Sequence, residues 1–383
     1  MHTTSKPYLH NLTALRGLAA VLVVVLHFDF FVGKLVTGPA GEVLHHFYLM
    51  VDLFFILSGF VICYVYERDF TDGIDRRKFG GFVRARFARI YPLHVFALLA
   101  EVGLYLSYIV SSKDHLLPAY QQYMYKWEAV PVQLTFLQTV GIFNMDTWNA
   151  PSWSLSAEWW AYLLFPFLLI WMINNRSALP RVIAGVAVVG GWLFIEYYLA
   201  GREPFMQFPP NANKIALDVN WHYGTLRGII GFTAGMLIWH LYRNNALRRL
   251  LASGWAFGFL GLGILVSMHF PGTDTLTVCL MAFLILSAAY GAAGTDALLR
   301  FAPLQALGRW SFSIYIWHMV LINLLLAFFT FPRTEQVQGL LQPLNGDLLT
   351  ARLAFVAFLA LTCLVGYLSY RFLEKPSRKW LRK

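Results

Sequence analysis

Long apolar stretches alternate with short polar segments along almost the whole chain. A hydrocarbon core about 30 Å thick is crossed by about 20 apolar residues at 1.5 Å per residue. About ten stretches reach this length and are predicted to be transmembrane helices: residues 12–32, 47–66, 91–110, 155–173, 182–200, 223–242, 251–270, 274–293, 311–331 and 349–370. A shorter apolar run, Val130 to Val140, is expected to lie in the interface or to re-enter beside the protein. The pattern predicts an all-α, polytopic membrane protein.

Composition supports this fold class. The 383 residues are 58% hydrophobic and 13% charged, whereas a soluble domain carries about 25% charged residues. Lipid solvates an apolar exterior that water would not. The first apolar stretch contains Arg16 and His27 and lacks an A-x-A cleavage site, so we expect a retained span rather than a signal peptide. With no repeat or appended soluble domain, residues 1–383 are predicted to form a single membrane domain.

The distribution of charge predicts the orientation. The net charge is +10, but the basic residues lie in short loops between apolar runs and form no basic stripe, which argues against nucleic-acid binding. Placing both termini in the cytoplasm puts most of the 30 Lys and Arg residues on the inside, as the positive-inside rule requires. We therefore expect a multi-pass protein of the cell's inner (cytoplasmic) membrane, in contact with lipid and with cytoplasmic N- and C-termini.

The cysteines indicate neither a disulfide framework nor a metal site. Cys63, Cys279 and Cys363 each lie inside an apolar run, and none belongs to a CxxC pair. We expect buried, inert thiols and no metal.

Arg16 and His27 are the most informative ionisable pair within a predicted span. They are 11 residues apart, so at 100° per residue they share one helix face, separated by about 16 Å along the axis. With the N-terminus inside, Arg16 lies near the cytoplasmic boundary and His27 lies deeper. A snorkelling arginine and a hydrogen-bonded core histidine are the structural alternative. If functional, the pair offers a phosphate-binding cation and a proton acceptor on one face.

Arg86 and Arg89 lie in the segment Arg84 to Pro92, and their spacing makes them neighbours on a helix. Guanidinium groups suit bidentate phosphate binding, although a solvated loop that sets the topology would also explain them.

Three further segments combine polar and apolar side chains within predicted spans. They carry Asp52 and Ser58; Ser154, Ser156 and Glu158; and Ser311, Tyr315 and His318. The last three residues share a helix face. Polar contacts between packed helices would explain each segment alone. Their occurrence together favours a hydrated active site.

Six segments resemble the acyltransferase 3 family of integral membrane acyltransferases. In chain order they read LRGLAAVLVVVLHF, VDLFFILSGFVI, RARFARIYPLHVF, PSWSLSAEWWAYLLFP, LGRWSFSIYIWHMVLI and FLEKPSRKW, from Leu15 to Trp380. Each motif alone is weak, but the ordered set is specific. The resemblance implies a ten-helix bundle that uses acyl-CoA, commonly acetyl-CoA. It also implies acceptors that are usually sugar hydroxyls of lipopolysaccharide, exopolysaccharide, peptidoglycan or Nod factor, and sometimes antibiotics.

The resemblance also implies functional positions. The family's arginine–histidine signature falls on Arg16 and His27, its cytoplasmic arginine motif on Arg86 and Arg89, and its fourth-span glutamate on Glu158. Some family members carry a C-terminal SGNH hydrolase-like domain, and this chain is expected to lack one. How the acyl group would reach an acceptor on the outer face then stays open.

A mechanism follows as a hypothesis. Burial in an apolar span keeps a histidine neutral and able to accept a proton, which makes His27 the expected base. Glu158 or Asp52 would orient it, and the sequence does not choose between them. Arg16, Arg86 and Arg89 would hold the CoA phosphates.

The other expected groups concern the acceptor. Ser311, Tyr315 and His318 would bind it or donate to the oxyanion. Without a GxSxG elbow, direct transfer is favoured over an acyl-enzyme.

Two other classes fit a polytopic chain with buried charges. One is a secondary transporter or flippase of a lipid-linked sugar, which would show paired, broken spans in equivalent halves; the sequence has none. The other is a non-catalytic sensor or scaffold. The oligomeric state stays open, and a homo-oligomer is compatible with the sequence.

Overall fold

The computed structural model describes residues 8–112, 114–117, 119–173, 177–206, 210–330 and 347–381, and this part of the chain is helical without a strand. The α-helices are α1 (His10–Phe31), α2 (Pro39–His45), α3 (Met50–Phe70), α4 (Arg76–Val110), α5 (Ala119–Met124), α6 (Ala129–Leu134), α7 (Trp153–Ile173), α8 (Leu179–Phe194), α9 (Gly224–Arg243), α10 (Arg248–Leu251), α11 (Gly254–Ser267), α12 (Asp274–Ala289), α13 (Asp296–Leu299), α14 (Ala302–Thr330), α15 (Leu348–Ser369) and α16 (Lys375–Leu381).

Short 3₁₀ or π segments join several of these helices. They are η1 (His46–Leu49), η2 (Asp114–Leu116), η3 (Ala150–Ser152), η4 (Ile195–Leu199), η5 (Ala200–Arg202) and η7 (Tyr370–Glu374). They make continuous helical units of α2 with α3 and of α15 with α16.

A helix forms within each of the ten predicted stretches, which confirms the all-α class for the described residues. Seven helical units of the described chain are long and apolar enough to cross a membrane: His10–Phe31, Pro39–Phe70, Arg76–Val110, Ala150–Met172, Leu179–Arg202, Ala302–Ala327 and Leu348–Leu381. Helices α11 and α12 are apolar but have only 14 and 16 residues, and α9 is not among the seven. Ten spans and cytoplasmic termini therefore stay predictions.

Small residues allow the closest helix contacts. Helix α1 packs most extensively against α14, and α3 against α9. A Cβ atom on Gly59 of α3 would overlap the carbonyl oxygen of Phe232 on α9, and one on Gly308 of α14 would overlap the carbonyl oxygen of Thr13 on α1. In a membrane, where burial gives no hydrophobic gain between helices, such close backbone approach supplies the van der Waals contact.

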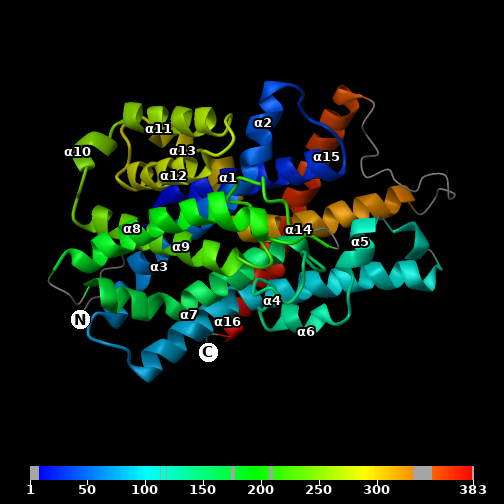
Figure 1. Cartoon of the computed structure of the whole chain (residues 1–383), viewed down its shortest axis with the longest axis horizontal. Coiled ribbons are helices and arrows are strands. Elements are labelled where there is room, and N and C mark those ends of the chain that lie inside the picture. Colours follow the sequence, from blue (N-terminus) through cyan, green and yellow to red (C-terminus); the bar gives the residue numbers. More distant parts are fainter. Residues whose placement is uncertain are drawn as a thin grey trace.

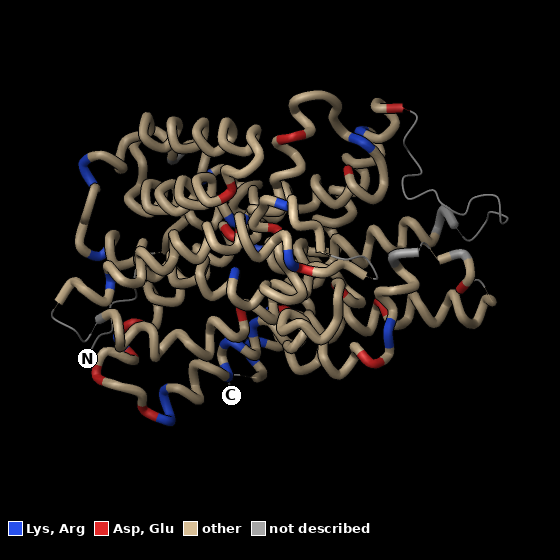
Figure 2. Tube along the Cα trace, viewed as in Figure 1, with Lys and Arg blue, Asp and Glu red and all other residues tan. Residues whose placement is uncertain are grey.

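The helix pairs α1 with α14 and α3 with α9 lie at the centre of the molecule (Figure 1). Helices α11 and α12 pack against each other at one end, on the side away from α4, and α16 lies against α4 (Figure 1). Long uncharged stretches fill the helices, and many of the charges lie at helix ends and in loops (Figure 2).

The short apolar run after α5 folds back into the protein. It contains α6, whose Gln133 is buried. The Gln133 carbonyl accepts from His94 Nε2 at 2.9 Å, and its side-chain amide donates to the Thr147 carbonyl at 2.8 Å. Further along the segment, the hydroxyls of Thr139 and Ser156 share a hydrogen bond of 2.8 Å. The segment packs against the helical bundle, and whether it re-enters the membrane or lies in the interface stays a prediction.

Candidate active site

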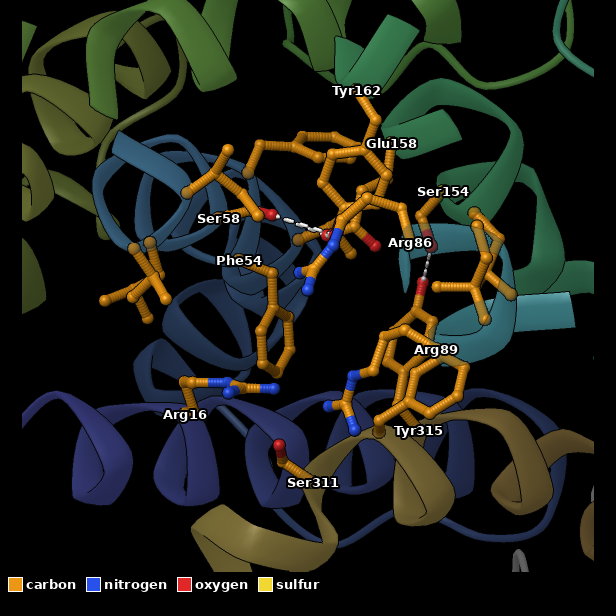
Figure 3. Close-up of a pocket in the computed structure, with 18 residues that line it drawn as sticks. Arg16, Phe54, Ser58, Arg86, Arg89, Ser154, Glu158, Tyr162, Ser311 and Tyr315 are labelled. Atoms are coloured by element: carbon orange, nitrogen blue, oxygen red, sulfur yellow. Dashed lines mark hydrogen bonds between the residues drawn. The ribbon is translucent and has the colours of Figure 1, made fainter. Parts of the chain in front are cut away.

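Three predicted arginines line one cavity of about 120 Å³ between α1, α3, α4, α7 and α14. Arg16 comes from α1, and Arg86 and Arg89 come from successive turns of α4. In Figure 3 the three guanidinium groups point toward a common space. We call this space the arginine cavity. Its other polar lining residues are Ser58, Ser154, Glu158, Tyr162, Ser311 and Tyr315.

The three arginines differ in how they are held. Arg86 donates from Nη2 to the Tyr66 hydroxyl at 3.0 Å, and Arg89 forms a salt bridge with Glu374. Arg16 makes no hydrogen bond or salt bridge with any residue that the structure describes, although the positive charge of Arg89 and the negative charges of Glu158 and Glu374 act on it through space. An unpaired cation away from bulk water needs an anionic partner. Arg16 is therefore available to an anionic ligand.

Glu158 lies on the wall of the arginine cavity rather than beside His27. Its Oε1 accepts a hydrogen bond from Ser58 Oγ at 2.6 Å and another from the Tyr162 hydroxyl. The structure records no contact between Glu158 and His27. Glu158 therefore does not orient the imidazole in this conformation, and its position suits balancing the arginine charges.

His27 lines a second cavity, of about 400 Å³, which we call the histidine cavity. The two cavities abut, because Val51 and Tyr315 line both. The remaining polar or aromatic lining residues include Phe30, Phe31, His45, Tyr48, Asp146, Trp153, Asp218, Asn220 and Arg227. The predicted shared face of Arg16 and His27 thus leads to two neighbouring cavities, divided by Val51 and Tyr315.

Backbone hydrogen bonding fixes the tautomer of His27. Its Nδ1 lies 2.9 Å from the carbonyl oxygen of Val23, one turn earlier on α1. Because a carbonyl only accepts, Nδ1 carries the proton, and Nε2 of the neutral ring keeps its lone pair. His27 is therefore prepared to accept a proton at Nε2.

His318 packs against His27 and lines neither cavity. The ring centroids are 4.9 Å apart with an interplanar angle of 60°. His318 Nδ1 donates to the Tyr315 carbonyl at 2.5 Å, and its Nε2 is buried without a partner in the described chain. In this tautomer Nε2 has no proton to donate, so the geometry does not support His318 as an oxyanion donor. Its contact with the site is the packing of its ring against the His27 ring.

The other two predicted residues of α14 reach the cavities. Ser311 lines the arginine cavity and donates to the Gly308 carbonyl at 3.0 Å. The Tyr315 hydroxyl shares a hydrogen bond of 2.8 Å with Ser154 Oγ and lies 3.1 Å from the Pro151 carbonyl. The sequence predicts that Ser311, Tyr315 and His318 share one helix face. Ser311 and Tyr315 line the arginine cavity, Tyr315 also lines the histidine cavity, and His318 contacts His27 of α1 instead.

A buried ion pair supports the histidine cavity. Arg227 Nε lies 3.0 Å from Asp52 Oδ1, Nη2 lies 2.6 Å from Oδ2, and both side chains are fully buried. The Arg227 guanidinium also lies 5.1 Å from the centre of the Trp153 ring. Asp52 therefore balances Arg227 and has no contact with His27. The sequence indicates that both residues need a partner, since Asp52 and Arg227 are charged positions inside predicted spans.

Loop carboxylates complete the same wall. Burial would raise the pKa of Asp218, but the positive charges of Lys214 and Arg227 outweigh it and hold that pKa below its usual value. By contrast, burial and then the charges of Glu203 and Asp218 raise the pKa of Asp146 well above its usual value. Nothing in the sequence pattern singled out these loop residues.

The fold and the two cavities define a multi-pass helical membrane protein with a charged, hollow interior. The family model described as an acyltransferase domain matches residues 9–371. The chain belongs to this acyltransferase family, as the ordered motifs predicted. Similar proteins include the peptidoglycan O-acetyltransferase OatA of Listeria monocytogenes, 23% identical over 98% of this chain and 56% of the relative.

The O-acetyltransferase OatA of Staphylococcus aureus is 22% identical over 98% of this chain and 58% of its own length. The chain thus spans a little over half the length of the curated relatives it matches.

Proposed function

We propose that the protein transfers an acyl group, in the first instance acetyl, from acyl-CoA to a hydroxyl group of a cell-wall glycan. Family membership supports acyl transfer, and the names of the relatives favour O-acetylation and peptidoglycan as the glycan. One observation carries the proposal for this chain. Arg16, which has no paired anion among the described residues, lines one cavity, and His27, whose Nε2 keeps its lone pair, lines a second cavity that meets the first at Val51 and Tyr315.

The arginine cavity is proposed as the donor site. Its volume of about 120 Å³ is well below the roughly 300–1,000 Å³ of sites that enclose a drug-sized ligand. It therefore holds the acyl thioester and the adjoining end of the pantetheine arm, with the nucleotide phosphates outside its mouth. The positive charges of Arg16, Arg86 and Arg89 attract the anionic donor to the mouth of the cavity, and their N–H groups donate to the carbonyl oxygens of the thioester and the pantetheine arm. Glu158 keeps the three cations from accumulating an unbalanced charge.

The histidine cavity is proposed as the acceptor site. The acceptor hydroxyl donates to His27 Nε2, and its oxygen attacks the thioester carbonyl carbon at the boundary formed by Val51 and Tyr315. The proton passes to Nε2, the carbonyl electrons move onto oxygen, and a tetrahedral intermediate forms. When the C–O double bond reforms, the C–S bond breaks, and the imidazolium returns the proton to the departing thiolate. No covalent acyl-enzyme is required.

The proposed topology places the arginine cavity toward the cytoplasm. Ten spans with both termini in the cytoplasm give the inner side most of the basic residues. Acyl-CoA is a cytoplasmic donor, so the cation-lined cavity then opens toward its supply. Helix α9 and the two short helices α11 and α12, added to the seven long apolar units, would complete the count of ten.

The test is a transfer assay on membranes that contain the full chain. Membranes are incubated with radiolabelled acetyl-CoA and purified cell-wall glycan, and alkali-labile label in the glycan is measured. Ester-linked label that depends on the chain is expected. Gradient-driven uptake of a sugar without ester formation would instead favour the transporter, and would overturn the proposal.

A further inference from the structure

The C-terminal helical segment is tied directly to an arginine of the donor cavity. Glu374, the last residue of η7, forms a salt bridge with Arg89 of α4 and accepts from Ser313 Oγ at 2.8 Å. The same carboxylate lies 3.4 Å from Arg378 Nη1 of α16. One buried carboxylate therefore joins an arginine on the cavity wall to an arginine outside it.

Arg378 has hydrogen-bonding capacity that the described residues leave unused. Its side chain is 27% exposed, and its Nε is buried without a partner. A guanidinium has five N–H donors in a planar fork, and the single contact with Glu374 occupies only part of that fork. A cation held in place with open donors is suited to a multivalent anion.

The surroundings of Arg378 are strongly basic. Lys375 and Lys379 lie on the same short helix, and both are exposed. Blue segments gather beside the C-terminal end of the chain, next to α4 (Figure 2). Lys375, Arg378 and Lys379 thus form a basic group on the helix that packs against α4, which carries Arg89.

Size makes a second anion-binding position necessary if the proposed function is right. The cavity of about 120 Å³ is smaller than sites that enclose a drug-sized ligand, so we expect the adenosine phosphates to lie beyond its mouth. Those phosphates carry several negative charges that cannot rest against lipid. The contact chain from Arg89 through Glu374 leads to Arg378.

We propose that α16 forms the outer half of the donor site, with Arg378 binding the adenosine phosphates of acyl-CoA. Glu374 lies between Arg89 and Arg378 and holds the two guanidinium groups at a fixed spacing, so that the donors of Arg378 not used by Glu374 bind the phosphates. The ligand class is a nucleotide carrying a diphosphate and a further phosphate. This inference rests on the proposed function, because it assigns a position to the donor.

The test compares two donors that differ in the nucleotide. Purified full-length wild type and Arg378→Gln are assayed with acetyl-CoA and with S-acetylpantetheine, which has the same thioester and no phosphate. Loss of a charge-assisted hydrogen bond at a partly exposed site predicts a KM for acetyl-CoA raised about tenfold, with little change in kcat. Turnover of S-acetylpantetheine is expected to be the same in both proteins.

Arg371→Gln is the matched control. Arg371 lies in η7 close to Arg378 in sequence, is exposed, and donates to the Tyr367 hydroxyl at 2.8 Å. Its substitution removes the same charge from the same segment and should leave the KM for acetyl-CoA unchanged.

Three outcomes overturn the inference. If Arg378→Gln has a wild-type KM for acetyl-CoA, α16 is not part of the donor site. If it slows both donors equally, its role is structural. If Arg371→Gln has the same effect, only the general positive charge matters. In all three cases wild-type turnover of acetyl-CoA leaves the proposed function standing, whereas a wild type inactive with both donors removes the function itself.

Discussion

The arginine cavity and the histidine cavity share a wall but differ in how far nearby carboxylates balance their buried arginines. In the arginine cavity, three guanidinium groups face Glu158, Arg89 has a partner in Glu374, and Arg16 has no paired anion in the described chain. In the histidine cavity, the one buried guanidinium, that of Arg227, is matched by Asp52 and approached by Asp218 at 3.9 Å. The arginine cavity therefore has one arginine, Arg16, without a paired anion in the described chain, whereas Arg227 of the histidine cavity is paired with Asp52.

The difference indicates which ligand each cavity can take. A buried charge without a partner is costly, so the open cation favours a ligand that brings negative charge. A neutralised wall with hydroxyl, amide and aromatic groups, such as Tyr48, Asn220 and Trp153, suits an uncharged polyhydroxy ligand. Substitutions in one cavity should therefore affect chemistry or stability differently from substitutions in the other.

The largest effect is expected at His27. His27→Ala removes the Nε2 lone pair, and loss of a general base lowers the rate about 10²–10⁴-fold. Acetyl transfer from labelled acetyl-CoA, normalised to the amount of inserted protein, measures it. The KM for acetyl-CoA should change little, because His27 does not line the arginine cavity.

His240→Ala is the control, since His240 lies in the last turn of α9, lines neither cavity and shares a hydrogen bond with Asn244. It should retain wild-type transfer. Turnover by His27→Ala at more than about a tenth of the wild-type rate would place the base elsewhere.

Removing one partner of the Asp52–Arg227 ion pair should mainly lower the stability of the protein. Asp52→Asn leaves Arg227 charged and fully buried, and removal of one partner of a buried pair costs about 3–5 kcal/mol of unfolding free energy. Thermal melting in detergent should show a lowered Tm. Asp29→Asn is the matched control, because the partner of Asp29, Lys34, is 41% exposed and can be solvated by water.

A double substitution sharpens this result. Asp52→Leu with Arg227→Met replaces the pair by apolar groups, which is often close to neutral for stability. It should recover most of the Tm lost in Asp52→Asn. A double variant less stable than Asp52→Asn would mean that the pair is needed for more than mutual neutralisation.

A smaller, separable effect is expected in the arginine cavity. Arg16→Gln and Arg86→Ala should each raise the KM for acetyl-CoA about tenfold, the cost of one charge-assisted contact, and leave kcat within a few fold. Initial rates over a range of donor concentration measure this split. Arg68→Gln, at an exposed arginine near the end of α3, should behave as wild type. An unchanged KM in Arg86→Ala would mean that Arg86 does not bind the donor and serves only to set the membrane topology.

Much of the fold could be predicted from the sequence, because hydrophobic length and helix periodicity are local properties. Each of the ten predicted stretches contains a helix in the described chain, and Arg86 and Arg89 line one cavity as their spacing predicts. The span count is less secure, since the lengths of α11 and α12 fall short of a full crossing. Length alone therefore predicts helices better than it predicts crossings.

The partners of the charged residues could not be predicted, because they depend on how distant helices pack. Arg89 meets Glu374 across 285 residues of sequence, and Arg227 meets Asp52 across 175 residues. Both acids suggested as partners of His27 are engaged elsewhere: Glu158 with Ser58 and Tyr162, and Asp52 with Arg227. Periodicity identifies which face a side chain occupies, and only the tertiary arrangement determines what it meets there.

The smallest effect tests the loop side of the histidine cavity. The pKa of Asp218 is lowered, since Lys214 and Arg227 outweigh burial, so its carboxylate stabilises the fold above the unfolded pKa of about 3.9. That stabilisation is lost as the pH falls through the folded pKa. Asp218 is 38% exposed, so solvent screening limits the gain to below about 1 kcal/mol. Asp218→Asn should therefore melt slightly below wild type at pH 7, and the two melting curves should converge as the pH falls below 4. An Asn variant that melts above wild type at pH 7 would mean that the loop carboxylate is an excess negative charge, and the histidine cavity would then not be neutralised as its contacts indicate.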